Sequence, residues 1–287
     1  MQWNPRRLPR MRQQMAAYLQ DPDTDMARDA PRYREEIAAL GRQLRPAELY
    51  WVAPDMAALA VSSADQLPDL RFLPSDRPAD VGLIVFDGGA GALAYQGAEI
   101  PIDALSWGPD RGGMRLWQWI RRTRVEEALH RQGGELAAWL PPLIPVFGGV
   151  LDVATEPSPV AELPEDLRTS ATTLAAAWHL MAQPRLVDRD QLRPDKAERR
   201  ALARAGSSAS DVTLVDLRRQ YVPQTQDQEP GGAKRQYRHR FVVSGHWRDQ
   251  AHGPERSLRR RTWIPSYLKG PDGAPLLATT RVNVWRR

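Results

Sequence analysis

The residues best suited to chemistry gather toward the C-terminal end of the sequence. Three of the five histidines, His239, His246 and His252, fall within fourteen residues, and Trp247 and Trp263 stand among neighbouring arginines. Imidazole exchanges protons near neutral pH, guanidinium groups bind phosphate, and indole rings stack on bases. This combination indicates a site for an anionic partner.

The charge of the chain is unevenly distributed. Its 287 residues carry a formal net charge of +5. Residues 234–287 hold 13 Lys and Arg against 3 Asp and Glu, a net charge of +10, so the remaining residues carry −5. A local positive field concentrates polyanions even where the whole chain is nearly balanced. We therefore predict nucleic acid, either DNA or RNA, as the main partner.

In this interpretation basic side chains neutralise phosphates and aromatic side chains stack on unpaired bases. The predicted contact residues are Arg240, Arg248, Arg259, Arg260, Arg261, Lys269, Trp247 and Trp263. One alternative is a solvated basic face with the tryptophans in a core, because arginine is common throughout the chain. Another is an interaction surface for an acidic protein partner, such as a cognate inhibitor.

A hypothesis of a different class is metal-independent cleavage of RNA, as in a ribonuclease-like toxin. His246, or His239 in its place, would remove the 2′-hydroxyl proton. Arg248 and Lys269 would stabilise the developing negative charge on phosphorus, and Tyr267 would assist. The catalytic residues would then be His246, Arg248 and Tyr267. The sequence leaves open whether the protein is an enzyme.

Neither a metal nor a cofactor is expected. The three clustered histidines are seven and six residues apart, with only Asp249 as a nearby carboxylate, and match no common metal site. The chain has no cysteine, which excludes disulfides, thiolate zinc sites and a Cys nucleophile. Gly88, Gly89 and Gly91 do not have the GxGxxG spacing of a dinucleotide-binding turn and indicate a hairpin turn.

Hydrophobic spacing predicts the elements that position these residues. Helices are expected at residues 9–20, 31–44, 54–67, 121–131, 164–183 and 194–205. Strands are expected at residues 49–52, 81–86, 92–95, 100–107, 114–120 and 212–217. The continuous apolar run at 81–86 predicts a central strand buried on both faces, and 140–149 a buried connection. The fold class is therefore α+β, with a mainly antiparallel sheet and flanking helices.

A change in composition separates the basic segment from the rest. Residues 224–233, rich in Gln, Asp, Pro and Gly, predict a linker. We expect an α+β body over 1–223 and a basic β-rich module over 234–287, with strands at 237–247, 261–267 and 280–285. The alternative is one domain with a long loop. No run of about 18 apolar residues is present, so we expect a cytoplasmic protein that does not contact a membrane.

The basic segment also resembles a known group of proteins. Val243–Arg248, Arg259-Arg260 and Trp263–Pro271 are similar to a C-terminal motif of uncharacterised proteins from phages, prophages and plasmids of actinobacteria and other Gram-positive bacteria. Looser similarity at 49–52, 82–87 and 104–108 extends the resemblance over most of the chain. The resemblance implies a mobile-element setting, such as phage defence, a toxin–antitoxin pair or element maintenance. It assigns no role to any residue.

Overall fold

The chain divides into two compact units, Met1–Arg218 and Arg219–Arg287. The computed structural model describes residues 3–67, 69–70, 72–95, 98–110, 112–131, 140–152, 158–218 and 241–269. The predicted linker at 224–233 lies outside these residues, so the predicted boundary stays a prediction. Within the described ranges, no helix is both long enough and apolar enough to cross a bilayer.

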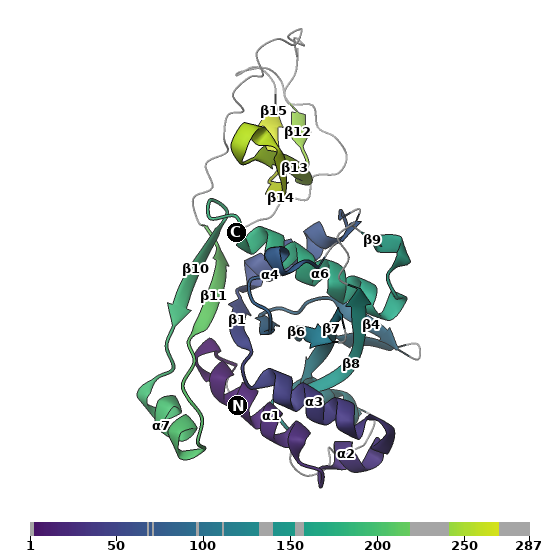
Figure 1. Ribbon diagram of the computed structural model, residues 1–287, viewed down its shortest axis with the longest axis vertical. Helices are drawn as coiled ribbons and strands as arrows, with labels where there is room; N and C mark the ends of the chain where they lie inside the picture. The colour runs from purple at the N-terminus through teal and green to yellow at the C-terminus, as the bar shows by residue number, and fades with distance from the viewer. Residues whose placement is uncertain are drawn as a thin grey trace. The chain divides into compact units, whose positions relative to one another are not determined.

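The first unit is built on a seven-stranded sheet with helices on both faces (Figure 1). The strand order is β10-β11-β1-β3-β6-β7-β8. These strands are β1 Glu48–Val52, β3 Gly82–Phe86, β6 Ala104–Asp110, β7 Gly113–Arg121, β8 Leu143–Asp152, β10 Val187–Leu192 and β11 Val212–Leu217. The α-helices are α1 Leu8–Gln20, α2 Asp25–Asp29, α3 Arg34–Leu44, α4 Pro54–Ala64, α5 Arg122–Arg131, α6 Glu165–Met181 and α7 Lys196–Arg204.

Short elements complete this unit. Two small antiparallel pairs are formed by β2 Asp69–Leu70 with β9 Ser158–Pro159, and by β4 Ala92–Tyr95 with β5 Ala98–Pro101. The 3₁₀ turns are Pro5–Arg7, Pro31–Tyr33, Pro74–Asp76 and Val160–Glu162. Each of these turns except the last begins with proline, whose fixed φ suits the first position of a helix.

Strand direction confirms the predicted α+β class with a mainly antiparallel sheet. Four of the six pairings in the seven-stranded sheet are antiparallel. The two parallel pairings join β1 to β3 and to β11 at the centre. All five residues of β3 are buried, as predicted for a strand covered on both faces.

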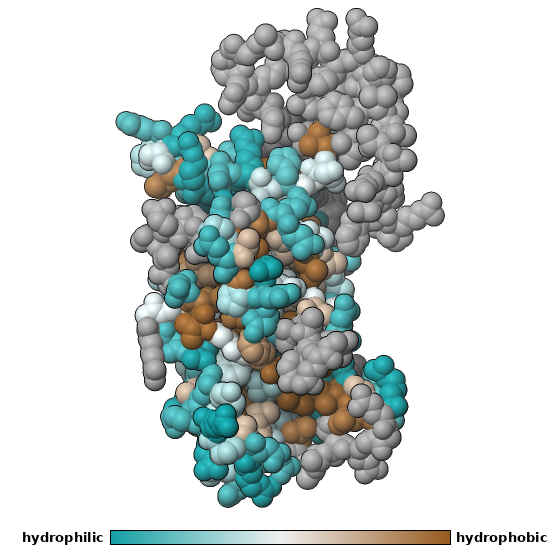
Figure 2. All heavy atoms as spheres, turned by 90° about the vertical axis from the view of Figure 1, so that its right-hand side faces the viewer, coloured by the Kyte–Doolittle hydropathy of each residue, from teal (hydrophilic) through white to brown (hydrophobic). Residues whose placement is uncertain are grey.

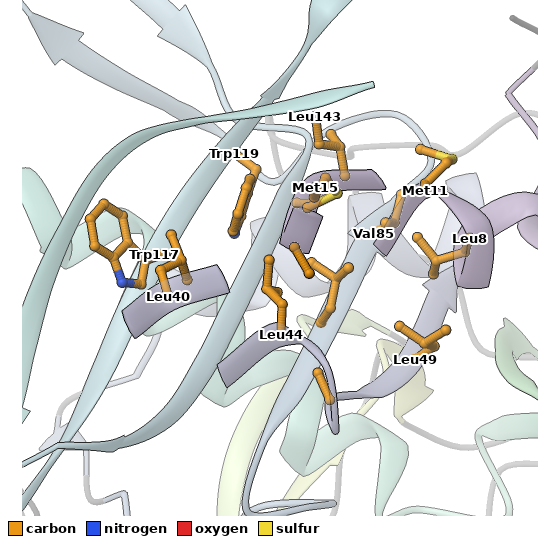
Figure 3. Packing of buried hydrophobic residues seen from close by; sticks show 14 of the residues in the cluster. Leu8, Met11, Met15, Leu40, Leu44, Leu49, Val85, Trp117, Trp119 and Leu143 are labelled. Atoms are coloured by element: carbon orange, nitrogen blue, oxygen red, sulfur yellow. The ribbon is translucent and has the colours of Figure 1, made fainter. Parts of the chain in front are cut away.

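One face of the sheet packs against α1 and α3. Alternate residues of β1 point to opposite faces, and Leu49 and Trp51 belong to the core cluster on this side. Figure 3 shows how leucines and methionines of the two helices meet the sheet, including Leu8, Met15 and Leu44. The apolar stripe of Ile37, Leu40 and Leu44 on α3 therefore faces the sheet, whereas Tyr33, in the turn before this helix, is exposed.

The opposite face packs against α4 and α6 through aromatic rings. Tyr50 of β1 stacks on Trp107 of β6, with ring centroids 5.8 Å apart. Trp107 meets Trp178 of α6 edge-on at 5.0 Å, and Trp178 meets Phe72 at 6.1 Å. Trp178 is thus a core residue. The first unit has three layers: helices, sheet and helices.

Two of the predicted elements of the first unit do not match the structure. Residues 100–107 are not one strand, because β5 ends at Pro101 and β6 begins at Ala104. Asp103 lies between these strands, and its carboxylate binds the side chains of Arg121 and Arg124. The prediction of a buried connection at 140–149 was wrong, because those residues lead into β8, the edge strand beside β7. The sequence did not indicate this strand because it contains Pro145, Gly148 and Gly149. Proline and glycine are nevertheless tolerated in strands at sheet edges and bulges.

The surface carries few large apolar side chains among the described residues. Those counted as exposed are Tyr33, Val146, Val150 and Leu258. The face drawn in Figure 2 accordingly mixes hydrophilic residues with smaller apolar patches. Val146 and Val150 lie on the edge strand β8.

The second unit contains two antiparallel strand pairs. The strands β13 His246–His252 and β14 Leu258–Ile264 form a hairpin, and β12 Phe241–Val243 pairs with β15 Tyr267–Lys269. The prediction of one strand over 237–247 was wrong within its described part, because the strand breaks at Ser244 and Gly245. A Cβ at Gly245 would lie 2.5 Å from Cζ2 of Trp263, so the chain passes too close to that indole for a side chain. The predicted strand at 280–285 lies outside the described residues.

Candidate nucleic-acid interface

The hairpin β13–β14 carries most of the predicted site residues that the structure describes. Its register pairs Trp247 with Trp263, Arg248 with Thr262, and Asp249 with Arg261. Directly paired residues share a face of an antiparallel ribbon, and successive residues alternate between faces. The register therefore sorts the predicted residues into two sets, one on each face of the hairpin.

One face holds the two tryptophans. Their rings meet edge-on with centroids 5.2 Å apart, and Trp263 is only 7% exposed. Such an arrangement is favourable for aromatic rings and anchors the base of the hairpin. The face of the Trp263 ring is consequently covered by protein, although the sequence had placed this residue among base-stacking contacts.

Arg261 lies on the same face and is neutralised within the hairpin. Its Nε and Nη2 atoms donate to the two carboxylate oxygens of Asp249 at 3.1 and 3.3 Å. The Arg261 side chain is 17% exposed, whereas the Asp249 side chain is 55% exposed. This two-pronged pair fixes the cross-strand register and compensates one of the predicted phosphate-binding charges.

The opposite face is basic and open. Arg248 and Arg260 belong to this set, because their cross-strand partners are Thr262 and Gln250. Both arginines are exposed. No carboxylate is paired across the hairpin from either residue. This face presents positive charge that the hairpin itself does not neutralise.

His246 shares that face and has a defined tautomer. Its Nδ1 lies 3.1 Å from the carbonyl oxygen of Ser244. A carbonyl only accepts hydrogen bonds, so Nδ1 carries the proton, and in the neutral ring Nε2 holds the lone pair. Arg248 is two residues further along the same strand face. A proton acceptor and a guanidinium group are thereby placed on one surface.

The tip of the hairpin is a strained turn. Gly253 has φ +78°, and the two non-glycine residues Glu255 and Arg256 also adopt positive φ, at 50° and 57°. Arg259 emerges beside this turn, is exposed, and donates from Nη1 to the carbonyl oxygen of Arg256 at 3.1 Å. The turn thus orients Arg259 through a single hydrogen bond and places further basic charge at the tip.

Several predicted site residues are not placed by the structure. Arg240 and His239 lie outside the described residues. For Tyr267 and Lys269 the structure describes only their backbone in β15, so a catalytic group of His246, Arg248 and Tyr267 remains a prediction. Among the residues that are described, no group of three or more His, Asp or Glu side chains could hold a metal ion.

A buried charged cluster in the first unit was not anticipated. The Asp103 carboxylate, which is fully buried, accepts hydrogen bonds from the backbone N–H of Arg121 and from Nε of Arg124, at 2.9 and 3.0 Å. Nε of Arg121 lies 3.0 Å from the same carboxylate. Burial lowers the pKa of Arg121, and the Asp103 charge opposes that shift. The sequence signal for this cluster was a lone Asp within the apolar stretch 100–107, since a buried carboxylate needs partners.

Fold and hairpin together define an α+β protein that carries a basic β-ribbon. No protein-family model matches the chain, and no curated protein matches it. Among solved structures, the chain is similar to one described as "Crystal structure of AcrVA2", with 13% identity and a TM-score of 0.38 over 92% of this chain and 86% of that one. At that level of similarity the match carries no inference about function.

Proposed function

We propose that this chain is a cytoplasmic nucleic-acid-binding protein of mobile-element origin, and that the β13–β14 hairpin contacts the phosphate backbone. The mobile-element setting rests on the sequence resemblance described above. The observation that supports binding most directly is the exposure of Arg248, Arg259 and Arg260 on one short hairpin.

The geometry of a two-stranded ribbon favours this proposal. A ribbon of this width can enter the major groove of duplex DNA or follow a single strand. The exposed arginines are divided between the two strands, with Arg248 on β13 and Arg259 and Arg260 on β14, so the two strands can offer charge to separate phosphates. The residues from Phe241 to Lys269 contain six Lys or Arg and two Asp or Glu, and one of those acids is already paired with Arg261.

Binding is tested with fluorescein-labelled duplex DNA, single-stranded DNA and RNA, measured by anisotropy across a salt series. Replacing Arg248, Arg259 and Arg260 by Gln removes three charges from exposed positions. For duplex DNA the slope of log K against log salt falls by about 0.9 for each lost phosphate contact, hence by about 2.7 for the triple variant. Unchanged affinity and slope for all three probes would contradict the proposal.

A matched control removes the same charge from the other unit. Arg199 and Arg200 are exposed on α7, and replacing both of them by Gln, together with Lys196, also takes three positive charges from the chain. This variant keeps the affinity of the wild type if the hairpin is the contact surface. Equal losses in both triple variants would show attraction to net charge alone. Salt-sensitive co-purification of an acidic protein without nucleic acid would favour the protein-partner alternative.

A second candidate function is metal-independent RNA cleavage, which the tautomer of His246 favours. Its free Nε2 can accept a 2′-hydroxyl proton, and Arg248 lies on the same face to stabilise negative charge on phosphorus. Cleavage of labelled RNA in the presence of EDTA, lost in His246→Ala and retained in His252→Ala, would establish it. RNA that stays intact with the wild-type protein would reject this candidate and leave the binding proposal unaffected.

A further inference from the structure

The open face of the β13–β14 hairpin is a set of residue rows that cross the two strands. Side chains alternate between the faces of a strand, so every second residue of the hairpin belongs to this face. We call it the basic face, and its four rows are His246 with Ile264, Arg248 with Thr262, Gln250 with Arg260, and His252 with Leu258. None of these residues is acidic.

The two central rows each combine a guanidinium group with an uncharged hydrogen-bonding side chain. Arg248 lies opposite Thr262, and Gln250 lies opposite Arg260. Arginine can donate two hydrogen bonds to O6 and N7 of guanine, and glutamine can bind N6 and N7 of adenine. Threonine can bind a base edge through its hydroxyl group or contact the methyl group of thymine. The central rows therefore match the chemistry of base edges as well as that of phosphates.

Apolar side chains flank the central rows. Leu258 is 53% exposed and lies in the row next to Gln250 and Arg260. Ile264, which is partly exposed, has the corresponding position beside Arg248. A phosphate group offers no apolar contact, whereas the major groove displays the methyl group of thymine. These two residues favour contact with base edges.

The spacing of the rows fits stacked base pairs. Neighbouring rows are two residues apart along each strand, which is about 6.8 Å. Base pairs follow each other at about 3.4 Å in DNA, so two neighbouring rows span about two base-pair steps. The major groove is about 12 Å wide and admits a two-stranded β-ribbon. A ribbon in this groove brings Arg248 and Arg260 to bases about two pairs apart.

The position of the tryptophans disfavours a single-stranded partner. Proteins that hold unpaired bases stack them on accessible aromatic rings. The basic face carries no Trp, Tyr or Phe, because Trp247 and Trp263 lie on the other face of the hairpin. Trp263 is only 7% exposed, and its ring contacts that of Trp247. The basic face therefore suits bases that are already stacked in a duplex.

We propose that the basic face enters the major groove of duplex DNA and reads its sequence. Arg248 and Arg260 contact guanines, and Gln250 contacts an adenine. Arg259 lies on the other face of the hairpin, where it contacts phosphate without reading a base. This inference rests on the proposed function, since it names the partner of the same hairpin.

The test is selection by the full chain from a library of randomised duplex DNA. Affinities for the enriched duplex and for a shuffled duplex are then compared by anisotropy at about 150 mM salt. Enrichment of a site with two guanines and an adenine is expected. A good base contact changes affinity by about 5- to 150-fold, so three contacts give a ratio of at least about 100.

The outcomes separate this inference from the binding proposal. Equal affinity for the enriched and shuffled duplexes would overturn sequence reading and leave nucleic-acid binding in place. Tighter binding of single-stranded DNA or RNA than of the enriched duplex would overturn it in the same way. Absence of binding to every nucleic acid would overturn both.

Neighbouring arginines provide matched variants. Arg260→Gln and Arg259→Gln remove the same charge from exposed residues on opposite faces. Arg260→Gln is expected to lower the ratio of the two affinities by about 5- to 150-fold, whereas Arg259→Gln weakens both duplexes alike. Gln250→Ala removes no charge and should weaken only the enriched duplex, and Gln66→Ala, on the exposed surface of the first unit, should bind like the wild type. A wild-type ratio in both Arg260→Gln and Gln250→Ala would overturn the inference.

Discussion

Replacing Asp249 by Asn should strengthen polyanion binding. Asp249 holds Arg261 through two hydrogen bonds, and its own side chain is more than half exposed. An exposed pair of this kind contributes about 0–1 kcal/mol, so the hairpin should remain folded. The variant removes one negative charge and releases Arg261 for a phosphate.

The size of the effect follows from counterion release. One additional phosphate contact on duplex DNA steepens the slope of log K against log salt by about 0.9. Between 50 and 200 mM salt, that slope changes the affinity ratio of Asp249→Asn to wild type by about 3.5-fold. Anisotropy titrations at the two salt concentrations resolve this difference.

A control is provided by Glu255, the other acid of the hairpin. Glu255→Gln removes the same charge at the turn, but it does not free an arginine that is held by two hydrogen bonds. It should raise affinity modestly and leave the slope nearly unchanged. Weaker binding by Asp249→Asn, or equal slopes in both variants, would refute the assignment of Arg261 as a compensated phosphate ligand.

Three further predictions concern stability, each measured by urea unfolding of the full chain. A Cβ at Gly82 would overlap the indole of Trp107, so Gly82→Ala should lower the free energy of unfolding by about 1–3 kcal/mol. This loss should be smaller in a Trp107→Phe background, where the ring is smaller. Strictly additive losses in the double variant would contradict the packing argument. Asp103→Ala should cost about 3–5 kcal/mol, because it removes the buried carboxylate that pairs with Arg121 and Arg124 and leaves Arg121 with only the more distant Asp87, at 3.7 Å. A loss below about 1 kcal/mol would show that water replaces the carboxylate. Glu255→Gly should stabilise the hairpin by about 0.5–1 kcal/mol, because Glu255 has a φ of 50°, which suits glycine better than glutamate. A destabilised variant would show that the backbone at Glu255 is not strained.

The local elements of the first unit were predictable because their signals are short-range. The periodic apolar residues ending at Leu44 indicate a helix with one buried face. The uninterrupted apolar run from Leu83 to Phe86 indicates a buried strand. The parallel pairing of β1 with β11 was not predictable, because these strands are about 160 residues apart and neither strand's sequence indicates which strand it pairs with. The order of strands in a sheet is a property of tertiary packing rather than of any window of sequence.

The composition of the candidate site was predictable, but the roles within it were not. Counting charges located the basic hairpin, and alternation divides its residues between two faces. Composition could not show that Trp263 is buried or that Arg261 is bound to Asp249, because both depend on the register of two strands.

The position of β1 between β3 and β11 also has a consequence for synthesis. Its parallel partner Gly82–Phe86 follows soon after it, but the partner on its other edge, Val212–Leu217, is translated much later. At about 5–20 residues per second, the edge of Glu48–Val52 waits roughly 10–30 s for that strand. An open edge is prone to pair with other chains, and such non-local pairings slow folding. Nascent chains stalled before residue 212 should therefore bind chaperones more than chains released after it.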